Sequence, residues 1–188
     1  VSTKGSPFIK KSEQWCDLLI GLSRPQTCKK VLELGTSLGV NSFEFVKADL
    51  SEKSYGDSKI FQNKAYEEFI LNGLSQSATF YKKPSFILSS KINLDKYKDK
   101  TQKIVLSPYT NKSLNDIELN FAEPLTVAIG PERGWTNDEL NHFRNNDFFE
   151  VSLSPSILRV ETATVAILSQ LELLKNENYG RINTGEVK

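Results

Sequence analysis

Two stretches in the C-terminal half of the chain each place an apolar run, a short loop and a helical pattern in direct succession. The first is Val-Ala-Ile-Gly-Pro-Glu-Arg-Gly-Trp at residues 127–135, and the second is Ser-Leu-Ser-Pro-Ser-Ile-Leu-Arg-Val-Glu-Thr-Ala at residues 152–163. A strand that ends in a loop and continues into a helix is the repeating unit of α/β folds. Because such loops can meet at one edge of a sheet, the two stretches predict a pocket where backbone groups bind a small charged cofactor.

Apolar segments alternate with helical patterns along the rest of the chain. This alternation predicts an α/β fold with a mainly parallel sheet flanked by helices. The expected strands cover residues 17–23, 40–48, 85–89, 103–106, 125–129 and 150–153. The first expected helix begins at Arg24-Pro25 and ends at Gly35 or Gly39, and the others cover residues 65–79, 137–145 and 160–174. Residues 49–63 are expected to form a polar loop, and residues 91–100 a charged helix or turn.

The length of 188 residues suits one well-buried domain with short extensions. Residues 13–175 are expected to form that domain, between a polar tail at residues 1–12 and a flexible tail at residues 176–188. The chain starts at Val1 and contains no methionine, so we expect that further residues once preceded it.

Composition excludes several classes of protein. No apolar run approaches the roughly 20 residues that a membrane span needs. Two cysteines, Cys16 and Cys28, are too few for a disulfide framework, so a reducing cytoplasm is the simplest expectation. The net charge is +1, from 24 basic and 23 acidic residues. Charge over the whole chain therefore does not indicate nucleic-acid binding.

A second glycine-bearing stretch offers an alternative cofactor site. Residues 31–40, Val-Leu-Glu-Leu-Gly-Thr-Ser-Leu-Gly-Val, resemble the glycine-rich turn of Rossmann-like S-adenosylmethionine methyltransferases, although Ser37 replaces the middle glycine. The competing interpretation places residues 26–37 in the helix opened by Arg24-Pro25, and it is the one we favour. Under the alternative, Glu33 to Gly39 would form the cofactor loop.

The loop at residues 130–134 is better placed for a ligand. It follows five apolar residues and precedes a helix that Thr136 or Asn137 can cap. Gly130 allows close approach of a ligand, and Gly134 can adopt a positive φ.

The second loop leads to charged residues at the start of the last expected helix. Arg159 and Glu161 flank the first turn of that helix, where free backbone N–H groups favour an anionic group. Purely structural roles are the alternative for both residues. Glu161 would then only complement the helix dipole, and Arg159 would only form a salt bridge with Glu132 or Glu161.

Together these loops resemble the C-terminal signature of the RsmE family of ribosomal RNA small-subunit methyltransferases, which belongs to the knotted SPOUT class. Further blocks follow in the family's order, so that the resemblance covers about residues 17–174. They are Leu-Ser-Arg-Pro-Gln-Thr at 22–27, Leu-Gly-Val-Asn at 38–41, Lys-Ser-Tyr at 53–55 and Gly-Leu-Ser-Gln-Ser at 73–77.

The resemblance implies a SPOUT-type α/β knot, in which the C-terminal segment threads through a loop as a deep trefoil. It also implies a homodimer that methylates a uridine ring nitrogen (uracil N3) of 16S ribosomal RNA, free or in an assembling subunit. The knot loops would bind S-adenosyl-L-methionine, mostly through backbone groups. The matching positions are Ile129, Gly130, Glu132, Arg133, Gly134, Leu153, Ser154, Ile157, Leu158 and Thr162.

Three departures from the family pattern stand out. The first loop of the family usually reads Gly-Pro-Glu-Gly-Gly, whereas Arg133 replaces its fourth residue here, and Ser75 stands where glutamate is usual. The family's N-terminal RNA-binding domain is absent, so residues 1–12 would be its remnant.

The expected reaction needs a group that stabilises negative charge and a group that accepts a proton. We assign the first role, at the base or a phosphate, to Arg159. Glu161 would orient Arg159 or accept the uridine proton, and Glu132 is the second candidate acceptor. No metal is expected, since the single histidine, His142, lies among polar neighbours on an expected helix. A third hypothesis, besides the two cofactor sites, is an RNA-binding relic of the fold without turnover.

Overall fold

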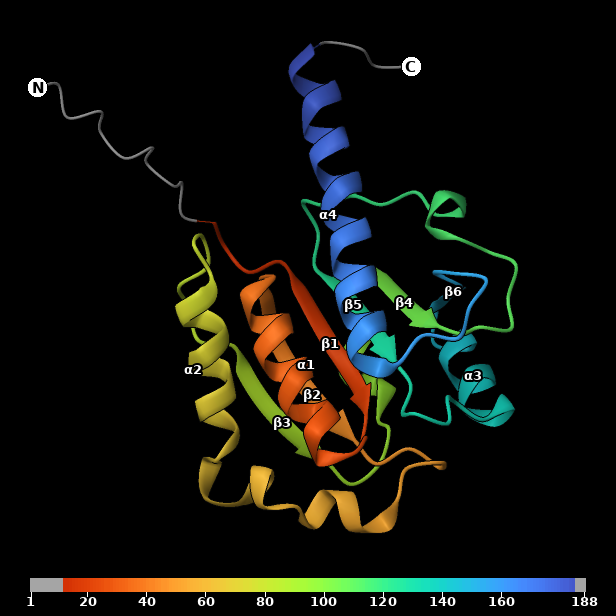
Figure 1. The fold of residues 1–188 in the computed structure, drawn as a ribbon. Coiled ribbons are helices and arrows are strands. Elements are labelled where there is room, and N and C mark those ends of the chain that lie inside the picture. Colours follow the sequence, from red (N-terminus) through yellow and green to blue (C-terminus); the bar gives the residue numbers. More distant parts are fainter. Residues whose placement is uncertain (1–11, 185–188) are drawn as a thin grey trace, which may run out of the picture.

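The computed structural model describes residues 12–184, which form one six-stranded sheet with helices on both faces (Figure 1). Every strand pairing is parallel, and the strand order is β3-β2-β1-β5-β4-β6. The strands are β1 (Cys16–Gly21), β2 (Val40–Val46), β3 (Ser85–Ser89), β4 (Gln102–Leu106), β5 (Leu125–Ile129) and β6 (Phe149–Val151). The six expected strands and the parallel sheet are thus confirmed.

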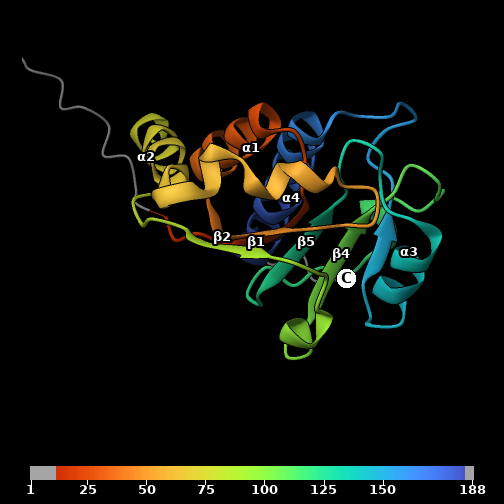
Figure 2. The ribbon, with the colours of Figure 1, turned by 90° about the horizontal axis from the view of Figure 1, so that it is seen from below.

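Three helices cover one face of the sheet and one helix covers the other. Helices α1, α2 and α4 lie together on the first face, and α3 lies on the opposite face toward the β6 edge, as the views in Figures 1 and 2 agree. Their bounds are α1 (Pro25–Ser37), α2 (Tyr66–Gln76), α3 (Asn137–Arg144) and α4 (Val160–Thr184). Short 3-10 helices connect the elements at η1 (Lys53–Asp57), η2 (Lys59–Lys64), η3 (Leu94–Tyr97) and η4 (Leu114–Asp116).

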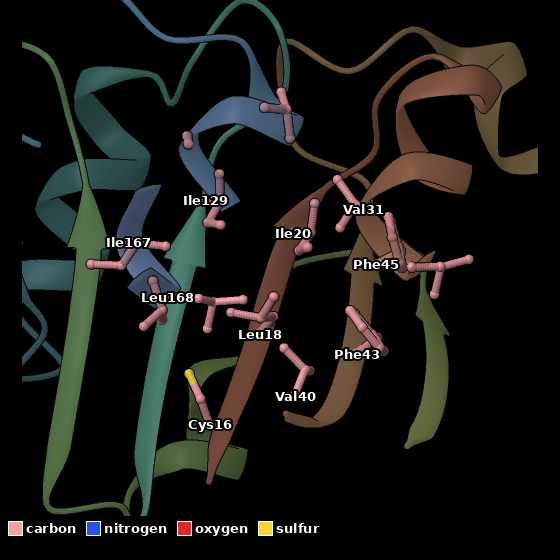
Figure 3. Packing of buried hydrophobic residues seen from close by; sticks show 14 of the residues in the cluster. Cys16, Leu18, Ile20, Val31, Val40, Phe43, Phe45, Ile129, Ile167 and Leu168 are labelled. Carbon is pink, nitrogen blue, oxygen red and sulfur yellow. The ribbon is translucent and has the colours of Figure 1, made fainter. Parts of the chain in front are cut away.

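The larger hydrophobic core lies between the sheet and helices α1 and α4 (Figure 3). Alternate strand residues such as Leu18 and Ile20 point to this face, where they meet Val31 of α1 and Ile167 and Leu168 of α4. All five are at most 1% exposed. Truncating a side chain such as Leu168 to alanine costs about 2–5 kcal/mol in a core of this kind.

A smaller core fills the space between the sheet and helix α3. This core is formed by the strand residues that point away from the larger core, such as Leu19 and Ala128. They face Phe143 of α3 and Trp135, which lies just before that helix. The rings of Trp135 and Phe143 have centroids 4.9 Å apart. This packing fixes α3, and with it the loop that connects β5 to the helix.

Helix α1 follows from its local sequence. Pro25 takes the first helical position, where its missing N–H costs nothing, and Cys28, Val31 and Leu32 give a buried face at helical spacing. The chain leaves the helix through Gly39, whose φ is +88° and whose added Cβ would lie 2.4 Å from the Phe80 ring.

The Rossmann-like alternative is therefore wrong. Glu33 and Gly35 lie inside helix α1 rather than in a strand and its turn. Gly35 serves close packing of the helix on the sheet, since an added Cβ would lie 2.9 Å from the Phe43 ring. The helix forms because burial of its apolar face stabilises it by more than the cost of one internal glycine, which is about 1 kcal/mol.

Some expected boundaries differ from the structure. The expected loop at residues 49–63 contains η1 and η2, and the segment at residues 91–100 contains only the short η3. Helix α4 continues to Thr184, past the expected end at residue 174 and into the segment expected to be a flexible tail. A helix already nucleated by packing extends at little cost through polar residues. Residues 1–11 and 185–188 lie outside the described part of the chain.

Both cysteines are free and buried, in agreement with the absence of a disulfide framework. Burial raises the pKa of the Cys28 thiol to about 12, and it also raises the pKa of Cys16. These thiols act as small apolar core side chains.

Candidate cofactor site

A cavity of about 250 Å³ lies at the carboxyl edge of the sheet, where the loops after β4, β5 and β6 meet. Because β5, β4 and β6 are adjacent and parallel, their following loops emerge side by side. The lining residues are 106–109, 129–135, 151–154, 156–158, Leu140, Val160 and Ala163. The two loops singled out by their sequence therefore do share one pocket.

The loop at residues 130–134 turns tightly enough to present its backbone to the cavity. The N–H of Gly134 donates to the carbonyl of Pro131 at 2.8 Å. Gly134 has a φ of +74°, which favours glycine. An added Cβ on Gly130 would lie 3.1 Å from the backbone of Gly134, so a side chain there would disturb the turn.

Glu132 fastens this loop to the start of helix α1. Its Oε1 accepts hydrogen bonds from the backbone N–H of Arg24 at 2.8 Å and from Oγ1 of Thr27 at 3.3 Å. Arg24 is the residue that precedes the helix, and no side chain of its own caps the first turn. A carboxylate at this position also suits the positive end of the helix dipole.

The second loop is held by hydrogen bonds among its serines. Oγ of Ser152 donates to the carbonyl of Ser154 at 3.1 Å, and the N–H of Ser156 donates to Oγ of Ser154 at 3.1 Å. Leu153 and Leu158 pack against the larger core, whereas Ile157 between them is 79% exposed. The loop thus has anchored ends and an exposed apolar tip.

The cavity brings together all the residues expected to hold the cofactor except Thr162. The cavity is lined by Ile129, Gly130, Glu132, Arg133, Gly134, Leu153, Ser154, Ile157 and Leu158. Thr162 is exposed on the first turn of α4 and lies outside the lining.

Arg159 and Glu161, the other expected catalytic residues, lie beside the cavity rather than in its lining. Glu161 pairs with Lys30 of α1, with 3.4 Å between Nζ and Oε1. Arg159 is exposed, and its side chain forms no ion pair within the described residues. The expected contact in which Glu161 orients Arg159 is therefore replaced by an ion pair between α4 and α1.

Sequence reasoning missed several parts of the lining. Among them are Trp135, which directly follows the first loop, Leu140 of α3, and residues 106–109 at the end of β4 and in the loop after it. Ser107-Pro108 follows a strand in the same manner as the two recognised loops, and this pattern could have indicated a third loop of the site. Nothing in the sequence placed β4 beside β5, so the third loop could not be assigned to the site.

The lining fits a cofactor that binds to backbone groups and apolar walls. Trp135 is 5% exposed, and its buried Nε1–H has no hydrogen-bond partner among residues 12–184. Glu132 and Arg133 are the charged residues among those that line the cavity. Apolar walls with a few polar groups are typical of small-molecule sites, so the residues fit an adenosyl cofactor.

Within residues 12–184, no cluster of histidine, cysteine, aspartate and glutamate side chains has the arrangement of a metal site. His142 is exposed on α3, as expected. The same residues include no helix with the length and apolar character needed to cross a bilayer.

Comparison with known proteins agrees with the sequence signature. Residues 10–172 match the model of the RNA methyltransferase domain family. The chain is 36% identical over 154 residues to ribosomal RNA small subunit methyltransferase E 1 of Borreliella burgdorferi, a match that covers 79% of this chain and 63% of the relative. It is 32% identical over 165 residues to ribosomal RNA small subunit methyltransferase E of Treponema pallidum, covering 79% of this chain and 58% of the relative.

The chain thus spans about three fifths of the length of these curated relatives. Among solved structures it resembles ribosomal RNA small subunit methyltransferase E of Neisseria gonorrhoeae bound to S-adenosyl methionine. The TM-score is 0.75 at 22% identity, covering 90% of this chain and 70% of that chain. This likeness confirms the expected fold class, while the threading of a knot stays a prediction. With a family model matched along most of its length, the chain belongs to the RNA methyltransferase domain family, and its resemblance to the RsmE members is confirmed.

Proposed function

We propose that this chain is the catalytic domain of an S-adenosylmethionine-dependent methyltransferase that acts on uracil N3 of a uridine in 16S ribosomal RNA. The observation that carries the proposal is the cavity shared by residues 129–135 and 151–158, in a chain of the RNA methyltransferase domain family. A structural neighbour with the same fold holds S-adenosyl methionine, and the curated relatives are named as small-subunit ribosomal RNA methyltransferases.

The two loops would hold the cofactor, mainly through backbone groups. S-adenosylmethionine, when bound, supplies an activated methyl group on a positively charged sulfur. Gly134 leaves the backbone of the first loop open to a ligand, since an added Cβ there would have nothing within 4 Å. The indole of Trp135 would form part of the wall of the site. We also propose a cofactor contact for Thr162, although it lies outside the lining in this structure.

In a methyl transfer of this kind, holding the base in line with the methyl group of the cofactor supplies much of the rate. The residues of the site therefore have few chemical tasks. We propose that the exposed guanidinium of Arg159 stabilises negative charge on the uracil or holds a neighbouring phosphate. Glu161 and Glu132 are the candidate acceptors for the uracil N–H proton. Glu161 is held by Lys30, and one oxygen of Glu132 already accepts the Arg24 N–H, so both carboxylates are fixed in place.

The remaining parts of the proposal concern assembly. We propose that residues 13–175 act as a homodimer in the cytoplasm, and that the substrate is 16S ribosomal RNA or an assembling subunit. Light scattering of the purified chain measures the oligomeric state directly.

Calorimetric titration of S-adenosylmethionine into the parent chain and into Gly130→Val tests the cofactor site. Binding should be lost in the variant, because a side chain on Gly130 meets the backbone of Gly134. Gly56→Val is the matched control, since an added Cβ there has only Leu22 within 4 Å, at 3.7 Å. Equal binding by all three proteins would place the cofactor elsewhere.

Methyl transfer is tested separately, with unmodified 16S ribosomal RNA offered naked or assembled into subunits. Mass spectrometry of the digested RNA should find one methyl group on the N3 position of uridine. A methyl group on another atom would refute the uracil-N3 assignment. Cofactor binding without transfer to either form of the RNA would instead support the non-catalytic relic.

A further inference from the structure

A tyrosine ring is exposed at the mouth of the cavity. Tyr109, in the loop after β4, is 76% exposed, and Ile157, at the tip of the second cofactor loop, is 79% exposed. These are the two most exposed large hydrophobic side chains among the described residues, and both line the cavity. Exposed apolar groups gathered at a pocket mark a site of interaction more often than scattered ones.

The loop that carries Tyr109 is fastened at both ends. The N–H of Ser107 donates to the carbonyl of Val151 at 3.0 Å, and the N–H of Ser152 donates to the carbonyl of Lys112 at 2.8 Å. Within the loop, the N–H of Tyr109 donates to Oγ of Ser107 at 3.2 Å. These bonds to β6 and to the residue after it fix the backbone, so the exposure of Tyr109 is a property of an ordered turn.

The Tyr109 side chain has no partner within the described residues, and other tyrosines of the chain differ in this respect. The Tyr97 hydroxyl donates to Glu44 at 2.8 Å, and the Tyr66 ring stacks on Phe86 with 3.8 Å between centroids. No such hydrogen bond or ring contact involves Tyr109 beyond its backbone N–H. Its ring faces are therefore free to contact a ligand beside the cavity.

The charges around this ring favour a polyanion. Arg133 lines the same cavity and is exposed, and Lys112, three residues after Tyr109, is exposed as well. Glu132 is the one carboxylate among the residues that line the cavity, and its Oε1 is occupied by Arg24 and Thr27. Arg133 forms no ion pair within residues 12–184, and Nζ of Lys112 lies over the Phe149 ring, 4.9 Å from its centroid. An aromatic face beside exposed cations is the combination that binds single-stranded nucleic acid.

We propose that the Tyr109 ring is the stacking platform for the nucleobase that enters the site, with Ile157 packing on the base from the opposite loop. This inference rests on the proposed function and adds the contact that holds the target base. A base must leave its neighbours before its ring nitrogen can reach a buried cofactor, and stacking on an aromatic side chain replaces the contacts that it loses.

The test is titration of single-stranded oligouridylate into the full chain saturated with S-adenosylhomocysteine. Tyr109→Ala should weaken this binding roughly 5- to 150-fold, the range expected for loss of one stacked base. Tyr109→Phe keeps the ring and should recover most of the lost affinity. Leu71→Ala, which removes an exposed apolar side chain from helix α2, should bind oligouridylate like the parent.

An abasic oligonucleotide of the same length separates stacking from phosphate binding. Tyr109→Ala should leave its affinity unchanged, because it offers no base to the ring. Equal weakening of both oligonucleotides, no weakening of either, or failure of the parent to bind oligouridylate would each overturn the proposal.

Two other outcomes would reassign Tyr109. A similar loss of S-adenosylmethionine affinity in Tyr109→Ala would place the ring in the cofactor site. A change in oligomeric state would place it in a contact between two copies of the chain. Failure of the parent to bind S-adenosylmethionine would instead refute the proposed function itself.

Discussion

Gly21, the last residue of β1, lies so close to Pro131 that a Cβ on the glycine would sit 2.4 Å from Cδ and 2.6 Å from N of the proline. Gly21 therefore sets the distance between β1 and the first loop of the candidate cofactor site. A residue far away in the sequence limits where that loop can lie.

Replacing Gly21 by alanine should displace residues 130–134. We expect the affinity for S-adenosylmethionine to fall at least about tenfold and stability to fall by about 1–3 kcal/mol, the usual cost of overpacking. Calorimetry and urea unfolding measure the two effects. Gly56→Ala serves as the control, because its Cβ would have room. Unchanged cofactor affinity in Gly21→Ala would show that the loop position does not matter for binding.

Glu132 can be tested as an anchor and as a proton acceptor in one pair of variants. Glu132→Ala removes the acceptor for the Arg24 N–H, so it should lower stability by about 1 kcal/mol and weaken cofactor binding. Glu132→Gln keeps an oxygen that accepts the same bond. If Glu132 only anchors the loop, the glutamine variant should retain turnover. Turnover lost with cofactor binding intact would identify Glu132 as the proton acceptor.

Arg159→Ala should lower turnover about 100-fold or more while cofactor affinity stays the same, since its guanidinium is proposed to meet the RNA and lies outside the cavity lining. Single-turnover kinetics with saturating cofactor provide the measurement. Lys91→Ala, which removes an exposed cation outside that lining, is the control. Undiminished turnover in Arg159→Ala would remove this residue from the mechanism.

Glu44 should make stability depend on pH. Burial alone would raise the pKa of this carboxyl, but hydrogen bonds from Lys96, Ser89 and Tyr97 outweigh it and hold the pKa below the ordinary value of 4.5. The unfolded chain thus binds the proton more tightly. The stability from Glu44 is fully present above about pH 4.5 and is lost as the pH falls through the lowered folded value.

Urea unfolding between pH 3 and pH 7 tests this linkage. Glu44→Gln should cost about 1–3 kcal/mol at pH 7, because Lys96 and Tyr97 lose a charged acceptor. Its stability should also change less than that of the parent as the pH is lowered through the acid range. Parallel pH profiles for the two proteins would show that other carboxylates dominate.

The positions of most helices and strands could be predicted because the sequence pattern that indicates each one lies within a few neighbouring residues. Ser85 to Ser89 and Leu125 to Ile129 are strands with the expected bounds, and Thr136 caps α3 in a reciprocal arrangement with Glu139. Proline at the first position of α1 was enough to place that helix. These features depend on a few neighbouring residues, whose conformational preferences are strong.

Long-range contacts were not predictable in the same way. The bond from Arg24 to Glu132 joins residues 108 positions apart, and the ion pair of Lys30 with Glu161 replaces the expected pairing with Arg159. The role of Tyr109 depends on β4 lying between β5 and β6. Such contacts follow from strand order, which hydrophobic periodicity alone does not determine.

The strand order also determines when the site can come into existence during synthesis. Strands β1 and β5 are adjacent at the centre of the sheet, although most of the chain separates them in sequence. The walls of the cavity come from β4, β5, β6, the loops that follow them and the start of α4, which leave the ribosome after β1, β2 and β3. A nascent chain therefore has no complete pocket until the start of α4 emerges, and a product terminated before that point would have nowhere to bind the cofactor.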